Sequence, residues 1–136
     1  MIIADTSALL ALFNGREPAH AAVREVVDAE AEPLVVSPYV VAELDYLVAT
    51  RLGVDAELAV LAELSGGAYH LAEMGPADLE AAAAVVGRYR DQELGVADAS
   101  LVVLAERYRI RSLLTLDHRH FSVVRPASGG RFKLLP

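Results

Sequence analysis

Three aspartates stand beside apolar segments of this 136-residue chain, where an unpaired carboxylate is costly. Asp5 follows the apolar run MIIA, and Asp117 follows SLLTL. Asp98 opens the segment GVADASLVVLAERY on its apolar face, because it precedes Leu101 by three residues and Val102 by four. Carboxylates brought together repel unless protons or cations neutralise them. Since the chain has no cysteine, an all-oxygen site for Mg²⁺ or Mn²⁺ is expected.

The aspartates can converge only if the secondary structure brings them to one edge. Short apolar runs predict strands at residues 1–4, 34–36, 68–72, 112–116 and 132–135. Helices are expected at residues 8–13, 17–31, 39–51, 54–64, 76–90 and 99–108, the first capped by Thr6 and Ser7. This alternation predicts one α/β domain over residues 1–136, a three-layer α/β/α sandwich with a short, mostly parallel central sheet. Ligands of such sheets bind at the carboxyl ends of the strands, where Asp5 and Asp117 would lie.

The helix expected at residues 39–51 carries two acids beside its apolar stripe, and periodicity does not choose between them. The apolar stripe of that helix is expected to consist of Val40, Val41, Leu44, Leu47 and Val48. Glu43 lies at one margin of the stripe and Asp45 at the other. The pattern alone therefore leaves both acids open.

Composition limits the class of protein. The formal net charge is −7, which argues against non-specific nucleic-acid binding. No apolar run approaches the roughly 20 residues needed to cross a bilayer, so a soluble, cytoplasmic protein without a membrane partner is expected. Hydrophobic residues make up 54% of the chain, for which two interpretations are open: a partner covers part of the surface, or the many alanines and valines inflate the fraction.

Four sequence blocks make the functional expectation specific. They are IIADTSALLALF, VVSPYVVAELDYL, GVADASLVVLAERY and LLTLDHRHF, in this order. With them the chain resembles PIN-domain ribonucleases over essentially its whole length, and most closely VapC-type toxins of bacterial toxin–antitoxin pairs. The resemblance implies a PIN-like fold and assigns the site to the acids Asp5, Glu43, Asp98 and Asp117 and the hydroxyl residues Ser7 and Thr115.

The resemblance also implies a mechanism for these residues. Asp5 and Asp98 are the expected direct ligands of Mg²⁺, with Mn²⁺ as an alternative. Three roles are open to Asp117: a direct contact with the ion, a contact through water, or a contact with a second ion. Glu43 is expected to orient or deprotonate the attacking water. The two hydroxyl side chains are expected to hold waters or ligand oxygens in place.

The implied activity is endoribonucleolytic cleavage of structured RNA, such as tRNA or rRNA loops, whose bases can be splayed out. Two interpretations are open for His118, Arg119 and His120, namely contacts to an RNA phosphate or a polar turn. A catalytically inactive PIN-like module that binds RNA or protein is the alternative function.

The resemblance further implies two protein partners. One is a VapB-type antitoxin, a segment of which would occupy a groove at the helices between Tyr39 and Leu64. The other is a second copy of the chain in a homodimer.

Overall fold

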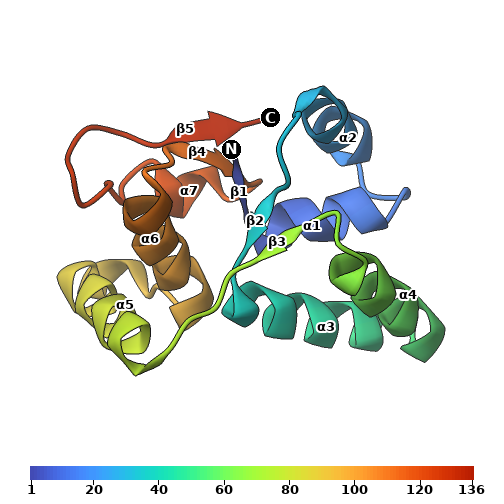
Figure 1. Ribbon diagram of the computed structural model, residues 1–136, viewed down its shortest axis with the longest axis horizontal. Coiled ribbons are helices and arrows are strands. Elements are labelled where there is room, and N and C mark those ends of the chain that lie inside the picture. The colour runs from blue at the N-terminus through green and yellow to red at the C-terminus, as the bar shows by residue number, and fades with distance from the viewer.

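The centre of the molecule is a sheet of five parallel strands in the order β3-β2-β1-β4-β5. The computed structural model describes residues 1–136. The strands are β1 (Ile3–Ala4), β2 (Val35–Val36), β3 (His70–Leu71), β4 (Ser112–Leu114) and β5 (Lys133–Leu135). All five expected strands are present, each shorter than its apolar run, and their ladder runs across the middle of the molecule (Figure 1).

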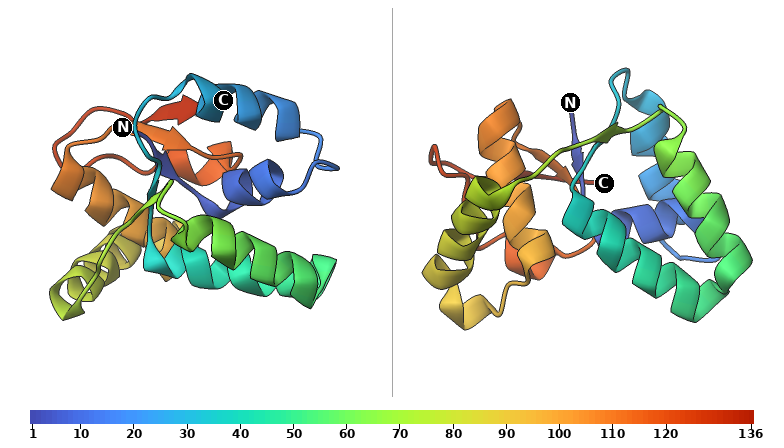
Figure 2. Two further views of the ribbon diagram at one scale, coloured as in Figure 1. Left: turned by 45° about the vertical axis from the view of Figure 1, so that its right-hand side comes forward. Right: turned by 60° about the horizontal axis from the view of Figure 1, so that its bottom comes forward.

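Helices cover the sheet on both sides. They are α1 (Thr6–Phe13), α2 (His20–Ala29), α3 (Pro38–Leu52), α4 (Val54–Ser65), α5 (Pro76–Arg88), α6 (Val96–Tyr108) and α7 (His118–Phe121), with a 3₁₀ turn at Arg90–Gln92. In the right-hand view of Figure 2, α5 and α6 lie on one side of the strands, and α1, α2 and α4 lie on the other. Helix α3 contacts both α1 and α6. The predicted three-layer α/β/α arrangement is therefore confirmed.

The core explains why the strands read as continuous apolar runs. Ile3, Ala4, Val35 and Val36 have no exposed surface, because helices cover both faces of the inner strands. The apolar stripe predicted for α6 is likewise buried, at Leu101, Val102, Leu104 and Ala105. No helix is both long enough and apolar enough to cross a membrane.

The start of α1 differs from the prediction. The helix begins at Thr6 and its N-cap is Asp5, whose Oδ1 accepts a hydrogen bond of 2.7 Å from the Thr6 backbone nitrogen. Thr6 and Ser7 therefore belong to the first turn and do not cap it. An aspartate is as good an N-cap as serine or threonine, so composition alone could not locate the boundary.

A pair of buried serines joins α3 to α6. Ser37 caps α3, accepting a hydrogen bond of 3.1 Å from the Tyr39 backbone nitrogen. Its Oγ lies 2.7 Å from that of Ser100, which donates in turn to the Ala97 carbonyl at 2.6 Å. Ser37 is therefore the donor to Ser100. This link fixes the beginning of α3, which carries Glu43, against the first turns of α6.

We expect Ser100→Ala to lower the free energy of unfolding by about 1–2 kcal/mol, because the buried Ser37 hydroxyl loses its oxygen acceptor and keeps only the weaker sulfur of Met74, 3.7 Å away. Urea denaturation measures this change. Ser122→Ala is the matched control, since that exposed hydroxyl bonds only to the Arg119 carbonyl, and we expect little change there. Equal unfolding free energies for the two variants would contradict a stabilising role for the serine pair.

Candidate active site

Three of the predicted acids lie at the beginnings of helices. Asp5 is the N-cap of α1, Asp98 lies in the first turn of α6, and Asp117 is the N-cap of α7. Helices α1 and α7 follow β1 and β4, so Asp5 and Asp117 lie at the carboxyl edge of the parallel sheet. Helix α6 follows α5 and the 3₁₀ turn, and its first turn places Asp98 in the same cleft. The N-terminus of a regular helix carries a partial positive charge, which favours a nearby carboxylate. The fold therefore supplies part of the charge that the cluster needs.

All four predicted acids line one cleft of about 310 Å³. Its lining consists of Asp5, Thr6, Ser7, Leu10, Glu43, Leu47, Arg51, Gly95, Asp98 and Asp117. The acids come from four separate segments of the chain, which the sheet and its helices bring together. The structure thus brings together Asp5, Asp98 and Asp117, as expected from the sequence, and Glu43, as the resemblance implied.

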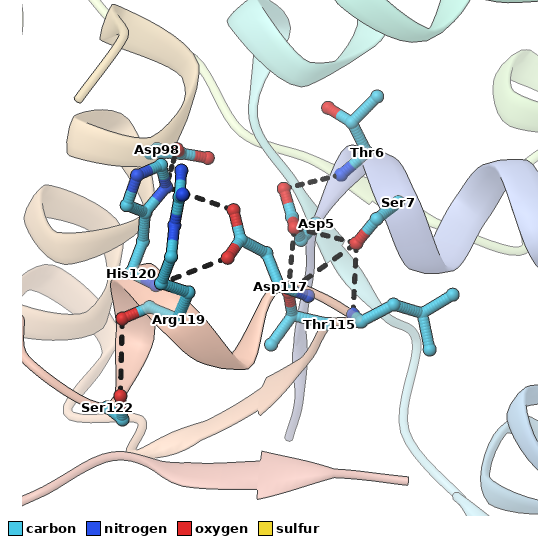
Figure 3. A network of polar contacts seen from close by, with 10 residues as sticks. Asp5, Thr6, Ser7, Asp98, Thr115, Asp117, Arg119, His120 and Ser122 are labelled. Carbon is cyan, nitrogen blue, oxygen red and sulfur yellow. Dashed lines mark hydrogen bonds and ion pairs between the residues drawn. The ribbon is translucent and has the colours of Figure 1, made fainter. Parts of the chain in front are cut away.

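Asp5 is the most tightly held of the four acids. It is 3% exposed, and three donors from the protein reach its carboxylate. Oδ1 accepts from the Thr6 backbone nitrogen at 2.7 Å, whereas Oδ2 accepts from the hydroxyls of Ser7 at 2.9 Å and Thr115 at 2.7 Å. Figure 3 shows the two hydroxyl groups converging on this carboxylate. The orientation of Asp5 is thus fixed by the protein itself.

The two hydroxyl groups are themselves oriented by the backbone after β4. Ser7 Oγ accepts a hydrogen bond from the Leu116 backbone nitrogen at 3.0 Å, and Thr115 Oγ1 accepts one from the Asp117 backbone nitrogen at 3.0 Å. Because each hydroxyl accepts from a backbone nitrogen and an ionised carboxylate can only accept, both hydroxyls donate their protons to Asp5. The carboxylate at the end of β1 is therefore tied to the segment that carries Asp117.

Burial and mutual repulsion disfavour the charged forms of the acids. Burial raises the pKa of Asp5 above its ordinary value, although the hydrogen bonds from Thr115, Ser7 and Thr6 act in the opposite direction. Burial, together with repulsion from the other three acids, raises the pKa of Asp98 from 3.8 to about 7, although His120 acts in the opposite direction. A positive charge placed among these groups would stabilise their ionised forms.

Helix α3 presents one face to the cleft. Glu43, Leu47 and Arg51 lie four residues apart along the helix and all line the cleft. Asp45, the alternative acid, lies instead against Glu57 of α4 and raises the pKa of that side chain. Sequence reasoning missed Arg51, although its spacing from Glu43 was a usable signal.

The residues after Asp117 form the short helix α7, where the alternatives were phosphate contacts or a polar turn. His118 and Arg119 are exposed. His120 turns inward: its Nδ1 lies 2.9 Å from Oδ2 of Asp117 and 3.5 Å from Oδ2 of Asp98 (Figure 3). Four residues are too few for a periodic signal, so the sequence predicted no helix here.

The match to a known protein family agrees with the fold and the acidic cleft described above. The profile of the PIN domain matches residues 2–125, which is most of the chain. The chain belongs to the PIN-domain family. A curated member, Ribonuclease VapC26 of Mycobacterium tuberculosis, is 65% identical over 135 residues, which cover 99% of this chain and 100% of the relative.

Solved structures share the PIN fold at low sequence identity. Mycobacterium tuberculosis VapC20, described as a Sarcin-Ricin loop cleaving toxin, superposes with a TM-score of 0.85 at 20% identity, with 100% of both chains covered. A toxin–antitoxin complex from Klebsiella pneumoniae has a TM-score of 0.72 at 19% identity and covers 93% of this chain and 94% of that one. VapBC2 from Rickettsia felis, bound to a DNA fragment from its promoter, has a TM-score of 0.70 at 14% identity and covers 100% of both chains.

The donors of this PIN domain suit a divalent cation. Asp98, Asp117 and His120 each offer one donor atom, and these atoms lie within 4.8 Å of one another. Asp5 lines the same cleft and contributes to the raised pKa of Asp98 by repulsion. The buried Nδ1 of His120 has no hydrogen-bond partner. Closely spaced carboxylate oxygens are ligands that Mg²⁺ and Mn²⁺ prefer.

We expect Asp98→Asn to raise the melting temperature of the metal-free PIN domain by several degrees at pH 8 and by much less at pH 4. The pKa of Asp98 is higher in the folded than in the unfolded chain. The folded state therefore binds the proton more tightly, and its stability falls as the pH rises from about 4 to 7. Asparagine cannot ionise, so it removes the loss of stability caused by the ionised Asp98, which is complete above pH 7.

Scanning calorimetry in the presence of a chelator measures this effect. Glu106→Gln, at an exposed position of the same helix, serves as the control and should behave alike at both pH values. A stabilisation by Asp98→Asn that is equal at pH 4 and pH 8 would contradict the explanation by charge.

Proposed function

We propose that the chain is the toxin of a type II toxin–antitoxin pair and acts as a Mg²⁺- or Mn²⁺-dependent endoribonuclease. The observation that carries this proposal is the cleft in which Asp5, Glu43, Asp98 and Asp117 face one another. The relatives support it, since one is Ribonuclease VapC26 and another, VapC20, is described as a toxin that cleaves the Sarcin-Ricin loop.

Asp5 and Asp98 are the proposed principal ligands of the cation. When bound, a divalent cation offsets the negative charge of the phosphodiester and lowers the pKa of a water molecule. Ser7 and Thr115 hold the Asp5 carboxylate in a single orientation for this task. Asp117 is the third carboxylate on the same rim, and its hydrogen bond from the His120 backbone nitrogen orients it.

Glu43 is the proposed proton acceptor. It is exposed on the face of α3 that lines the cleft, so an attacking water can reach it. Arg51 lies two turns further along the same face. Its guanidinium group is suited to bind a phosphate oxygen of the RNA, because it carries a permanent charge and several hydrogen-bond donors.

The proposed substrate is structured RNA with an accessible single-stranded loop, in tRNA or rRNA. The cleft is open to solvent and carries four acids, which repel a backbone phosphate of the RNA. The cation and nearby arginines are needed to offset this repulsion before the phosphate can enter the cleft. Arg119 and His118 are exposed beside Asp117 and are available for such contacts. A catalytically inactive binding module is less favoured, because such a module does not need four carboxylates in one cleft.

A separate groove of about 680 Å³ is the proposed site for the antitoxin. It lies between the end of α1, helix α2 and helix α4, and thus only partly on the two helices indicated by the sequence. Its lining includes the apolar residues Phe13, Val27, Val60 and Tyr69. An apolar groove between helices suits an amphipathic segment of a partner.

The proposed homodimer requires a further apolar surface. Helices α3 and α4 expose several large apolar side chains outside the core, at Tyr46, Leu52, Val54, Leu58 and Leu61. Such a group is uncommon on a monomer of this size and favours a protein contact.

The first prediction from this proposal concerns catalysis. Purified protein should cleave loop-containing RNA with Mg²⁺ or Mn²⁺ and should stop when a chelator is added. Asp98→Ala should lower the cleavage rate at least about a hundredfold, because one of the proposed cation ligands is lost. Gel analysis of end-labelled RNA measures the rate.

Glu106→Gln is the control for that experiment and should cleave at the normal rate, since Glu106 lies outside the cleft. Undiminished cleavage in chelator would refute the metal-dependent mechanism. RNA binding without cleavage under any of these conditions would favour the inactive binding module.

The second prediction concerns the antitoxin groove. Ala59→Arg places a long side chain at an exposed position in the groove lining. We expect it to weaken binding of the antitoxin encoded beside this gene at least about tenfold, because it fills space that the partner needs. RNA cleavage should remain normal but resist inhibition by the antitoxin. Calorimetry and a cleavage assay measure the two effects, and unimpaired inhibition would exclude this groove.

A further inference from the structure

One inward-facing side chain beside Asp98 and Asp117 has no part in the proposed catalysis. His120 lies on α7 three residues after Asp117, and its side chain is 13% exposed. The Oδ1 atom of Asp117 accepts a hydrogen bond of 3.2 Å from the His120 backbone nitrogen, while Oδ2 lies 2.9 Å from Nδ1 of the ring. The short helix therefore holds both side chains in one orientation toward Asp98.

The Nδ1 atom of His120 is buried but has no hydrogen-bond partner. Although Oδ2 of Asp117 is only 2.9 Å away, an N–H on the ring would not point at that oxygen closely enough to form one. A buried polar atom without a partner is unfavourable. A cation within reach of the nitrogen lone pair would satisfy it.

The spacing of the three donors fits shared coordination. Nδ1 of His120 is 2.9 Å from Oδ2 of Asp117 and 3.5 Å from Oδ2 of Asp98. Adjacent ligands on an octahedral ion with bonds of about 2.1 Å lie about 3 Å apart. We propose that His120 Nδ1 is a direct ligand of the cation together with Asp98 and Asp117, which makes the site selective for Mn²⁺ over Mg²⁺.

The selectivity follows from the chemistry of the nitrogen donor. Mg²⁺ binds oxygen ligands and retains several waters, whereas imidazole binds later divalent metals more strongly. An all-carboxylate site would not add this preference. The inference rests on the proposed cation site, but its test needs no RNA and no cleavage.

The binding test compares Mn²⁺ and Mg²⁺ affinities by calorimetry for the unmodified chain and for His120→Leu. Leucine has a similar size and no donor atom. We expect the Kd for Mn²⁺ to rise at least about tenfold and that for Mg²⁺ to change much less. His118→Leu, an exposed position on the same helix, should leave both constants unchanged. Equal losses for the two ions, or no loss for Mn²⁺, would overturn the proposal.

A spectroscopic test does not depend on the folding of any variant. Pulsed electron paramagnetic resonance of Mn²⁺ bound to the unmodified chain should show coupling to a nitrogen nucleus, and labelling of histidine with ¹⁵N should change that coupling. Bound Mn²⁺ without such coupling would refute ligation by His120. If Asp98→Ala still abolishes RNA cleavage in that case, the proposed nuclease stands without this inference.

Discussion

The arrangement depends on holding negatively charged oxygens together at one edge of the sheet against their mutual repulsion. The fold lowers this cost in two ways. Asp5, although almost wholly buried, receives one backbone and two hydroxyl hydrogen bonds. The beginnings of α1 and α6 also direct their partial positive charges toward the acids, and a backbone nitrogen of α7 donates to Asp117. The repulsion that remains between the carboxylates contributes to the raised pKa of Asp98. A bound cation would relieve this repulsion, which favours its binding.

The parts of this arrangement that follow from periodicity and strand position could be predicted from the sequence. Asp5 ends a buried strand, and Asp98 shares the apolar face of α6, so both had to lie near the core at the carboxyl edge of the sheet. A parallel sheet followed because apolar runs alternate with helical segments. These signals are strong because a strand that is buried on both faces must be apolar along its length, so a polar residue marks the end of the strand.

Other parts depend on tertiary contacts that have no local signal. Glu43 and Asp45 flank the same stripe, and only the packing of α4 turns Asp45 toward Glu57. The inward orientation of His120 depends on a four-residue helix that periodicity could not reveal. The Ser37–Ser100 contact joins residues 63 positions apart, and neither serine differs locally from an ordinary buried or capping serine.

Helix α1 belongs to both of the hollows described above. Its first turns contribute Thr6, Ser7 and Leu10 to the acidic cleft, and its last turn contributes Leu12 and Phe13 to the apolar groove. Eight helical residues span only about 12 Å, so the two hollows share one short rigid rod. The acidic cleft and the apolar groove therefore open at the two ends of one helix, and a change in the position of α1 would alter the shape of both.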